Sequence, residues 1–164
     1  MLLALCACGS KTVNTVNPVK LTLPQLQAQL VDDSAALQKL QSNYQERLMS
    51  DFRWCDSMLR DVPQELVNDY FTTLNLAQAY LNQFDELLPV MQHDITYTRT
   101  QLTNLQNDLD THFISDSLYQ EYLKDECAVA DTLHNRILYF QDRLDQQDQE
   151  LQSLKKNIRK VAPK

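Results

Sequence analysis

Residues 130–161, ADTLHNRILYFQDRLDQQDQELQSLKKNIRKV, carry the strongest structural pattern of the chain. Two rows of residues recur at every seventh position. The first row is Ile137, Leu144, Leu151 and Ile158, and the second is Phe140, Gln147, Leu154 and Val161. Leu133 and Ala130 extend the pattern backwards. Apolar residues that keep this spacing over several heptads predict a helix packed as in a coiled coil. The polar Gln147 in the stripe is a candidate for fixing the register.

The first half of the chain predicts another long helix at about 24–60. Thr22 is a suitable N-cap, and Pro24 falls in the first turn, where a missing N–H is tolerated. The apolar stripe comprises Leu26, Leu30, Leu37, Leu40, Tyr44, Leu48, Phe52, Cys55 and Leu59, with Asp33 as the polar member. The four-residue step from Tyr44 to Leu48 departs from the regular alternation. It predicts a stutter that relaxes the supercoil locally.

Two shorter helices are expected between these long ones, at about 62–84 and 89–112. Asp61 can cap the first of them, and Pro89 marks the boundary between the two. Ser115 and Ser117 are good caps for the final helix, at about 117–160, so we expect a hairpin near residues 112–117. The alternative is one continuous helix from 89 to 160.

These segments predict an all-α fold, an antiparallel bundle of two long and two short helices in up-down-up-down order. The short helices would cover part of the long pair and make a four-helix head. The remaining halves, with Leu26–Leu40 on one helix and Leu144–Ile158 on the other, would pair alone as an antiparallel coiled-coil stalk. The alternative is a rod that pairs with a second chain.

Composition excludes several classes of function. The one glycine is Gly9, so the body lacks the glycines of phosphate-binding and dinucleotide-binding loops. Net charge is −7, and residues 155–164 hold five basic residues and no acidic one. The rest of the chain is therefore strongly acidic, which argues against a nucleic-acid partner. No run approaches the roughly 18–20 apolar residues of a membrane-spanning helix.

The N-terminal segment Leu5-Cys6-Ala7-Cys8-Gly9-Ser10 resembles the lipobox of bacterial lipoproteins. The resemblance covers about ten residues and departs from the pattern in having no Lys or Arg ahead of a short apolar run. It implies that residues 1–7 are the remainder of a signal peptide and that Cys8 receives lipid. Residues 8–21, polar and aperiodic, would be the tether, and residues 22–164 the helical domain. Gly9 after the lipidated cysteine implies outer-membrane rather than inner-membrane delivery.

Removal of Cys6 and acylation of Cys8 would leave two thiols, Cys55 and Cys127. The antiparallel arrangement of the long helices places these two cysteines near one level of the bundle. A disulfide between them is therefore one hypothesis, and two buried thiols are the other. The three histidines share no spacing typical of metal ligands, and no catalytic constellation is evident. We therefore expect no metal, no cofactor and no enzymatic activity.

The sequence thus favours a lipid-anchored envelope protein with a structural or protein-interaction role, facing the periplasm or the cell surface. Its partners would be the membrane, through the lipid, and other envelope proteins or further copies of the chain. The basic residues near the C-terminus would contact the membrane surface if the last helix returns to the anchored end. They are Lys155, Lys156, Arg159, Lys160 and Lys164. The simpler explanation is that cations stabilise a helix C-terminus. The alternative function is ligand binding among the aromatic residues of the head, which are Phe52, Trp54, Tyr70, Phe71 and Tyr80.

Overall fold

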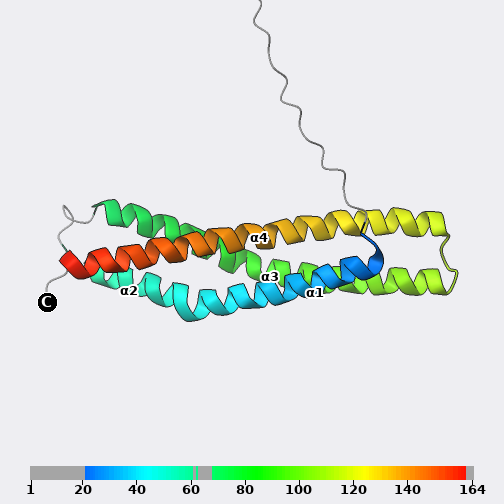
Figure 1. The fold of residues 1–164 in the computed structure, drawn as a ribbon, viewed down its shortest axis with the longest axis horizontal. Coiled ribbons are helices and arrows are strands. Elements are labelled where there is room, and N and C mark those ends of the chain that lie inside the picture. Colours follow the sequence, from blue (N-terminus) through cyan, green and yellow to red (C-terminus); the bar gives the residue numbers. More distant parts are fainter. Residues whose placement is uncertain (1–20, 61, 63–67, 162–164) are drawn as a thin grey trace, which may run out of the picture.

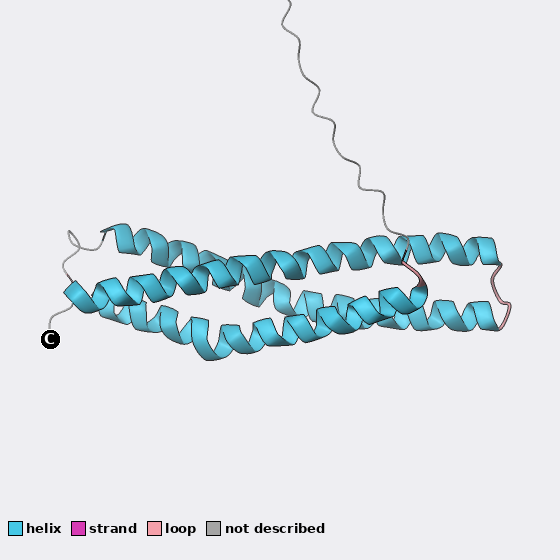
Figure 2. Ribbon diagram, in the orientation of Figure 1, coloured by secondary structure: helices cyan, strands magenta, loops and turns pink. Residues whose placement is uncertain are grey.

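The computed structural model describes residues 21–60, 62 and 68–161, and in this part of the chain three long helices run side by side (Figure 1). The described residues contain no strand (Figure 2), so the predicted all-α class is confirmed. The predicted count of four helices is wrong.

The first long helix consists of α1 (Leu23–Asn43), a π-helical turn η1 (Tyr44–Leu48) and α2 (Met49–Arg60), which follow one another without a break. Its start is the predicted one. The Thr22 backbone N–H donates to Gln25 Oε1 at 2.9 Å, as in a capping box. The π turn occupies the predicted irregular step. A π turn accommodates an extra residue, so the stripe returns to the core at Leu48 and continues to Cys55 and Leu59.

Helix α3 (Asn68–Asp110) replaces the two short helices expected at 62–84 and 89–112. Pro89 lies inside this helix and is exposed. The buried residues of α3 keep an unbroken heptad spacing across the proline, with Leu88 and Met91 both in the core. An interior proline costs a helix about 3 kcal/mol, and burial of apolar side chains on both sides of Pro89 offsets this. The predicted helix boundary was therefore wrong because packing overrides the local penalty.

A short loop joins α3 to α4 (Asp116–Val161) and confirms the predicted hairpin. His112 has a φ of 55°, the left-handed conformation that ends many helices. The backbone N–H of Phe113 donates to Asp108 O at 2.9 Å, and that of His112 to Leu109 O at 3.0 Å. The Ser115 hydroxyl oxygen accepts from Leu118 N–H at 3.3 Å and so caps α4.

Each long helix runs antiparallel to the one before it. With three helices instead of four, the first long helix and α4 therefore run parallel, not antiparallel as predicted. Three contacts join residues at a constant spacing of 101 positions. They are Asp33–His134, Arg47–Asp148 and Asp51–Gln152. The predicted two-helix stalk is also wrong. Leu26–Leu40 share a core with residues of α3 such as Ile95 and Leu102. At the opposite end, Leu151 and Ile158 pack with Leu59 and Leu74.

The core is apolar along the rod except for a few polar residues. An aromatic layer marks its middle, where Phe84 stands edge-on to Tyr44 and Phe140 with ring centroids 5.1 and 5.3 Å apart. The buried polar residues are Asp33, Asp51, Thr98 and Gln147. Both amide atoms of Gln147, the predicted register residue, are buried and lack a hydrogen-bond partner.

Candidate functional site

The predicted lipidation site, Cys8, lies outside the described residues, as do the predicted signal segment 1–7 and residues 8–20 of the predicted tether. The described chain enters the bundle at Leu21, whose carbonyl oxygen is 3.8 Å from Cys127 Sγ. Leu21 therefore lies towards the α3–α4 hairpin end of the rod, and α4 begins beyond that point (Figure 1).

Of the two hypotheses for Cys55 and Cys127, a disulfide or two buried thiols, the structure has two free thiols, with Cys55 buried and Cys127 half-buried. Cys127 contacts Leu21 at the hairpin end, whereas Cys55 packs among Leu151, Leu154 and Ile158 at the other end. The predicted Cys55–Cys127 bridge is therefore wrong, because it relied on an antiparallel pair of long helices. Burial raises the pKa of Cys55 to about 11, and burial also raises the pKa of Cys127. Both thiols consequently hold their protons near neutral pH and are weak nucleophiles.

The basic C-terminal residues lie at the end of the bundle opposite Leu23, so the reason for placing them beside the membrane anchor is wrong. The 38 residues from Leu23 to Arg60 separate the two ends by about 57 Å at 1.5 Å per residue. Lys156, Arg159 and Lys160 are exposed, and Lys164 lies outside the described residues. These positions are consistent with cations at a helix C-terminus.

Lys155 belongs to a polar cluster between α2 and α4. Its ammonium group pairs with the carboxylate of Asp51, which also accepts a hydrogen bond from Gln152. The side chains of Asp51 and Lys155 are 12% and 18% exposed, so the pair is largely withdrawn from water. The indole of Trp54 lies 5.6 Å from Lys155 Nζ and 5.4 Å from Arg159 Cζ, in cation–π contact with both. This cluster holds the two helices together and leaves Lys155 without a free charge for a ligand.

The aromatic residues suggested as a ligand site are used in packing. Phe52, Trp54, Tyr70 and Phe71 lie against the core cluster around Cys55 and Leu59. The Tyr80 ring lies 5.9 Å from Arg143 Cζ on a different side of the bundle. The five side chains therefore do not converge on one cavity.

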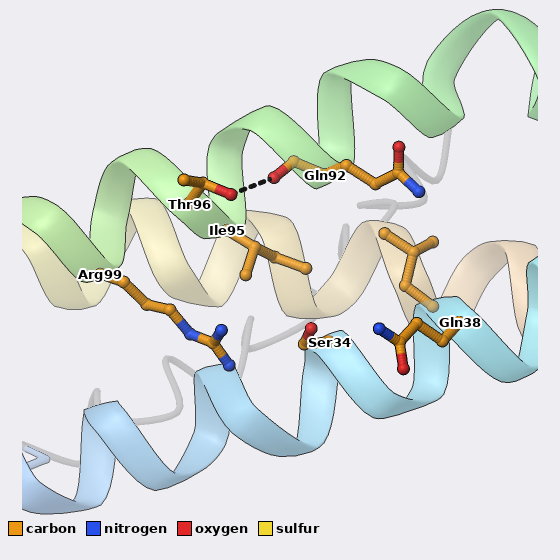
Figure 3. Close-up of a pocket in the computed structure, with 7 residues that line it drawn as sticks. Ser34, Gln38, Gln92, Ile95, Thr96 and Arg99 are labelled. Atoms are coloured by element: carbon orange, nitrogen blue, oxygen red, sulfur yellow. Dashed lines mark hydrogen bonds between the residues drawn. The ribbon is translucent and has the colours of Figure 1, made fainter.

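A shallow groove runs between α1 and α3, and Figure 3 shows its lining. Its volume is about 180 Å³, below the range of about 300–1,000 Å³ typical of small-molecule sites. Arg99 spans it and donates to Leu30 O at 3.1 Å, while Gln92 donates to Gln41 at 3.0 Å. These contacts make the groove a polar seam between two helices.

Sequence reasoning missed a row of exposed apolar side chains along the outside of the α3–α4 pair. We call this surface the outer α3/α4 seam. It comprises Leu76, Val90, Tyr97, Tyr122, Val129 and Tyr139, which are 41–55% exposed. Their spacing in steps of seven, as from Val90 to Tyr97 and from Tyr122 to Val129, was the available signal. It was hidden by the stronger core stripe beside it.

The described residues include no helix with the length and apolar character needed to cross a membrane. In the same part of the chain, His, Cys, Asp and Glu side chains form no group of three or more suited to a metal ion. Comparisons with protein-family models, with curated proteins and with solved structures found no match.

Proposed function

We propose that this protein is a lipid-anchored envelope protein whose helical rod has a structural or protein-interaction role and catalyses no reaction. The anchor is Cys8, in the segment that resembles a lipobox. The outer membrane is the proposed destination, with the rod in the periplasm or at the cell surface.

The observation that carries the proposed role is the shape of the core. Two apolar core clusters, both of which contact Phe52, join three helices of similar length between Leu23 and Ile158, and each contains fully buried side chains. Such a rod holds its two ends at a fixed separation, which is a property useful to a spacer or a scaffold. The polar cluster around Lys155 is used in packing, as are the aromatic residues that were considered for ligand binding. These uses favour the scaffold over the ligand-binding alternative.

Metabolic labelling with an alkyne-bearing fatty acid tests the anchor. The gene is expressed from its own upstream region, and the labelled chain is recovered from membranes and weighed intact. We expect label and the mass of an acylated chain beginning at Cys8. Cys8→Ser should abolish the label, and Cys6→Ser serves as the matched control that keeps it. An unlabelled wild-type chain that retains residues 1–7 would overturn the proposed anchoring.

A further inference from the structure

The three outer seams of the rod differ in character. The α1/α3 groove is lined mainly by polar side chains such as Gln38, Gln92 and Arg99. The α1/α4 groove is lined by Lys39, Glu46, Arg47, Gln141 and Asp145 among others. The outer α3/α4 seam differs in carrying six exposed apolar or aromatic side chains, although the groove beside Tyr122 is lined mainly by polar and acidic residues such as Gln101, Asp108 and Asp125.

Contacts fix the position of the six residues of this seam. On α3, Tyr80 and Asp94 face α4, where they meet Arg143 and Arg136. Leu76, Val90 and Tyr97 lie three or four residues from Tyr80 or Asp94, so they share that side of α3. On α4, Tyr139 contacts Arg143. Val129 and Tyr122 precede Arg136 by one and two heptads, and Tyr122 also lines a groove with α3 residues. The six side chains therefore border one surface.

We propose that a second copy of this chain docks on the outer α3/α4 seam, in an antiparallel two-fold arrangement centred near Tyr139. Three of the six residues are tyrosines, and Arg136 and Arg143 lie beside them; tyrosine and arginine are both enriched at protein–protein interfaces. The proposal stands independently of the lipid anchor and goes beyond it.

Charge selects the second copy and its orientation. Lys160 lies three heptads after Tyr139 on the same side of α4, with the exposed Lys156 one turn before it, whereas Arg159 faces Trp54 of α2. Asp125 lies two heptads before Tyr139 on that side, with Asp116 and Glu121 further towards the start of α4. A two-fold axis across the helices at Tyr139 brings the basic end of one copy opposite the acidic end of the other. A parallel pair would instead place like charges together.

The seam is large enough for a stable dimer. The α3 part runs from Leu76 to Tyr97, about 32 Å at 1.5 Å per residue. Two helices of about 10 Å diameter make the surface about 20 Å wide. The product is about 640 Å² per copy, near the lower end of the roughly 600–1,000 Å² that one partner contributes to a specific interface.

The mass of the full chain in solution tests this proposal. Cys6→Ser and Cys8→Ser prevent acylation, and light scattering with sedimentation equilibrium gives the oligomeric state over a range of concentrations. We expect twice the 19.1 kDa chain mass at micromolar concentrations. Val90→Glu with Tyr139→Glu should raise the dimer Kd at least ~10-fold, because burial of unpaired carboxylates is unfavourable. Circular dichroism would confirm that the helices remain.

Matched controls lie on the other two seams. Val31 is 57% exposed on α1 and precedes the groove residue Gln38 by one heptad. Leu138 is 47% exposed on α4 and shares a surface with Gln141 and Asp145, which also line the α1/α4 groove. Val31→Glu with Leu138→Glu should leave the dimer unchanged. The proposal is overturned by a monomeric wild type, or by equal weakening in both double variants. Binding of lipid vesicles by a monomeric chain would assign the seam to a membrane instead.

Orientation is tested by cross-linking of single introduced cysteines, with Cys6, Cys8 and Cys127 replaced by serine and Cys55 left buried. Tyr139→Cys should couple efficiently to its equivalent in the second copy, since it lies near the axis. Asp125→Cys should not, because the antiparallel arrangement places the two Asp125 positions far apart. Efficient coupling at Asp125→Cys would refute the antiparallel arrangement.

Discussion

Gln147→Leu should stabilise the bundle. Gln147 is fully buried in α4, and neither atom of its amide has a hydrogen-bond partner. A buried polar group without a partner costs about 1–3 kcal/mol. Leucine has a similar volume and removes that cost. The site has room for leucine because the small residue Ala77 of α3 lies opposite Gln147. Phe84 of α3 packs on Phe140 of α4, and in this antiparallel pair Ala77 and Gln147 both lie one heptad from that contact in the same direction along the rod.

We expect a gain of about 2 kcal/mol, which corresponds to a rise in Tm of about 4–8 °C for a domain of this size. Urea unfolding followed by circular dichroism measures it, with every variant at one protein concentration so that self-association contributes equally. Gln149→Leu, at an exposed position of the same helix, is the control and should change stability by less than about 0.5 kcal/mol. An unchanged or lower stability of Gln147→Leu would show that the Gln147 amide is satisfied and refute the reasoning.

Three further outcomes are expected. Lys155→Met removes the ion pair with the largely buried Asp51 and should destabilise the protein by about 1–3 kcal/mol in the same urea assay; no loss would mean that Gln152 alone satisfies the carboxylate. Pro89→Ala should stabilise α3 by up to about 3 kcal/mol in thermal unfolding, because alanine restores a helical N–H at an exposed position; unchanged or lower stability would contradict the proline penalty. With the N-terminal cysteines replaced by serine, a thiol reagent at pH 8 should modify half-buried Cys127 well before Cys55. Its rate should rise with pH, since a raised pKa leaves little thiolate at pH 8. Equal rates would contradict the burial of Cys55.

The regular parts of the fold were predictable because they depend on spacing. The heptads of α4, the long first helix and the irregular step at Tyr44 could each be located from apolar positions. Ser115 likewise predicted the hairpin. Pro89 could not be interpreted locally, since its effect depends on the burial of Leu88 and Met91 against the other two helices. Sequence shows the proline penalty but not the packing energy that outweighs it.

That single boundary error changed the predicted positions of distant residues. Each added helix reverses the direction of the next, so counting four instead of three turned α4 around. The predicted fold thereby placed Cys127 beside Cys55, and the basic residues beside the predicted anchor. In the structure the two cysteines lie towards opposite ends of the rod, and the basic residues lie at the end opposite Leu23. The outer α3/α4 seam was missed for another reason. Its apolar residues are one position away from core residues and become distinguishable only when exposure is known.

The parallel course of the first helix and α4 has a mechanical consequence. Leu23 and Val161 lie at opposite ends of the rod (Figure 1). Tension applied between them would pull the two parallel helices past each other along their axes. The load would fall at once on the Arg47–Asp148 and Asp51–Lys155 contacts and on the apolar layers between them. A hairpin pulled at one end opens layer by layer, whereas this bundle would resist as a unit until many layers gave way together.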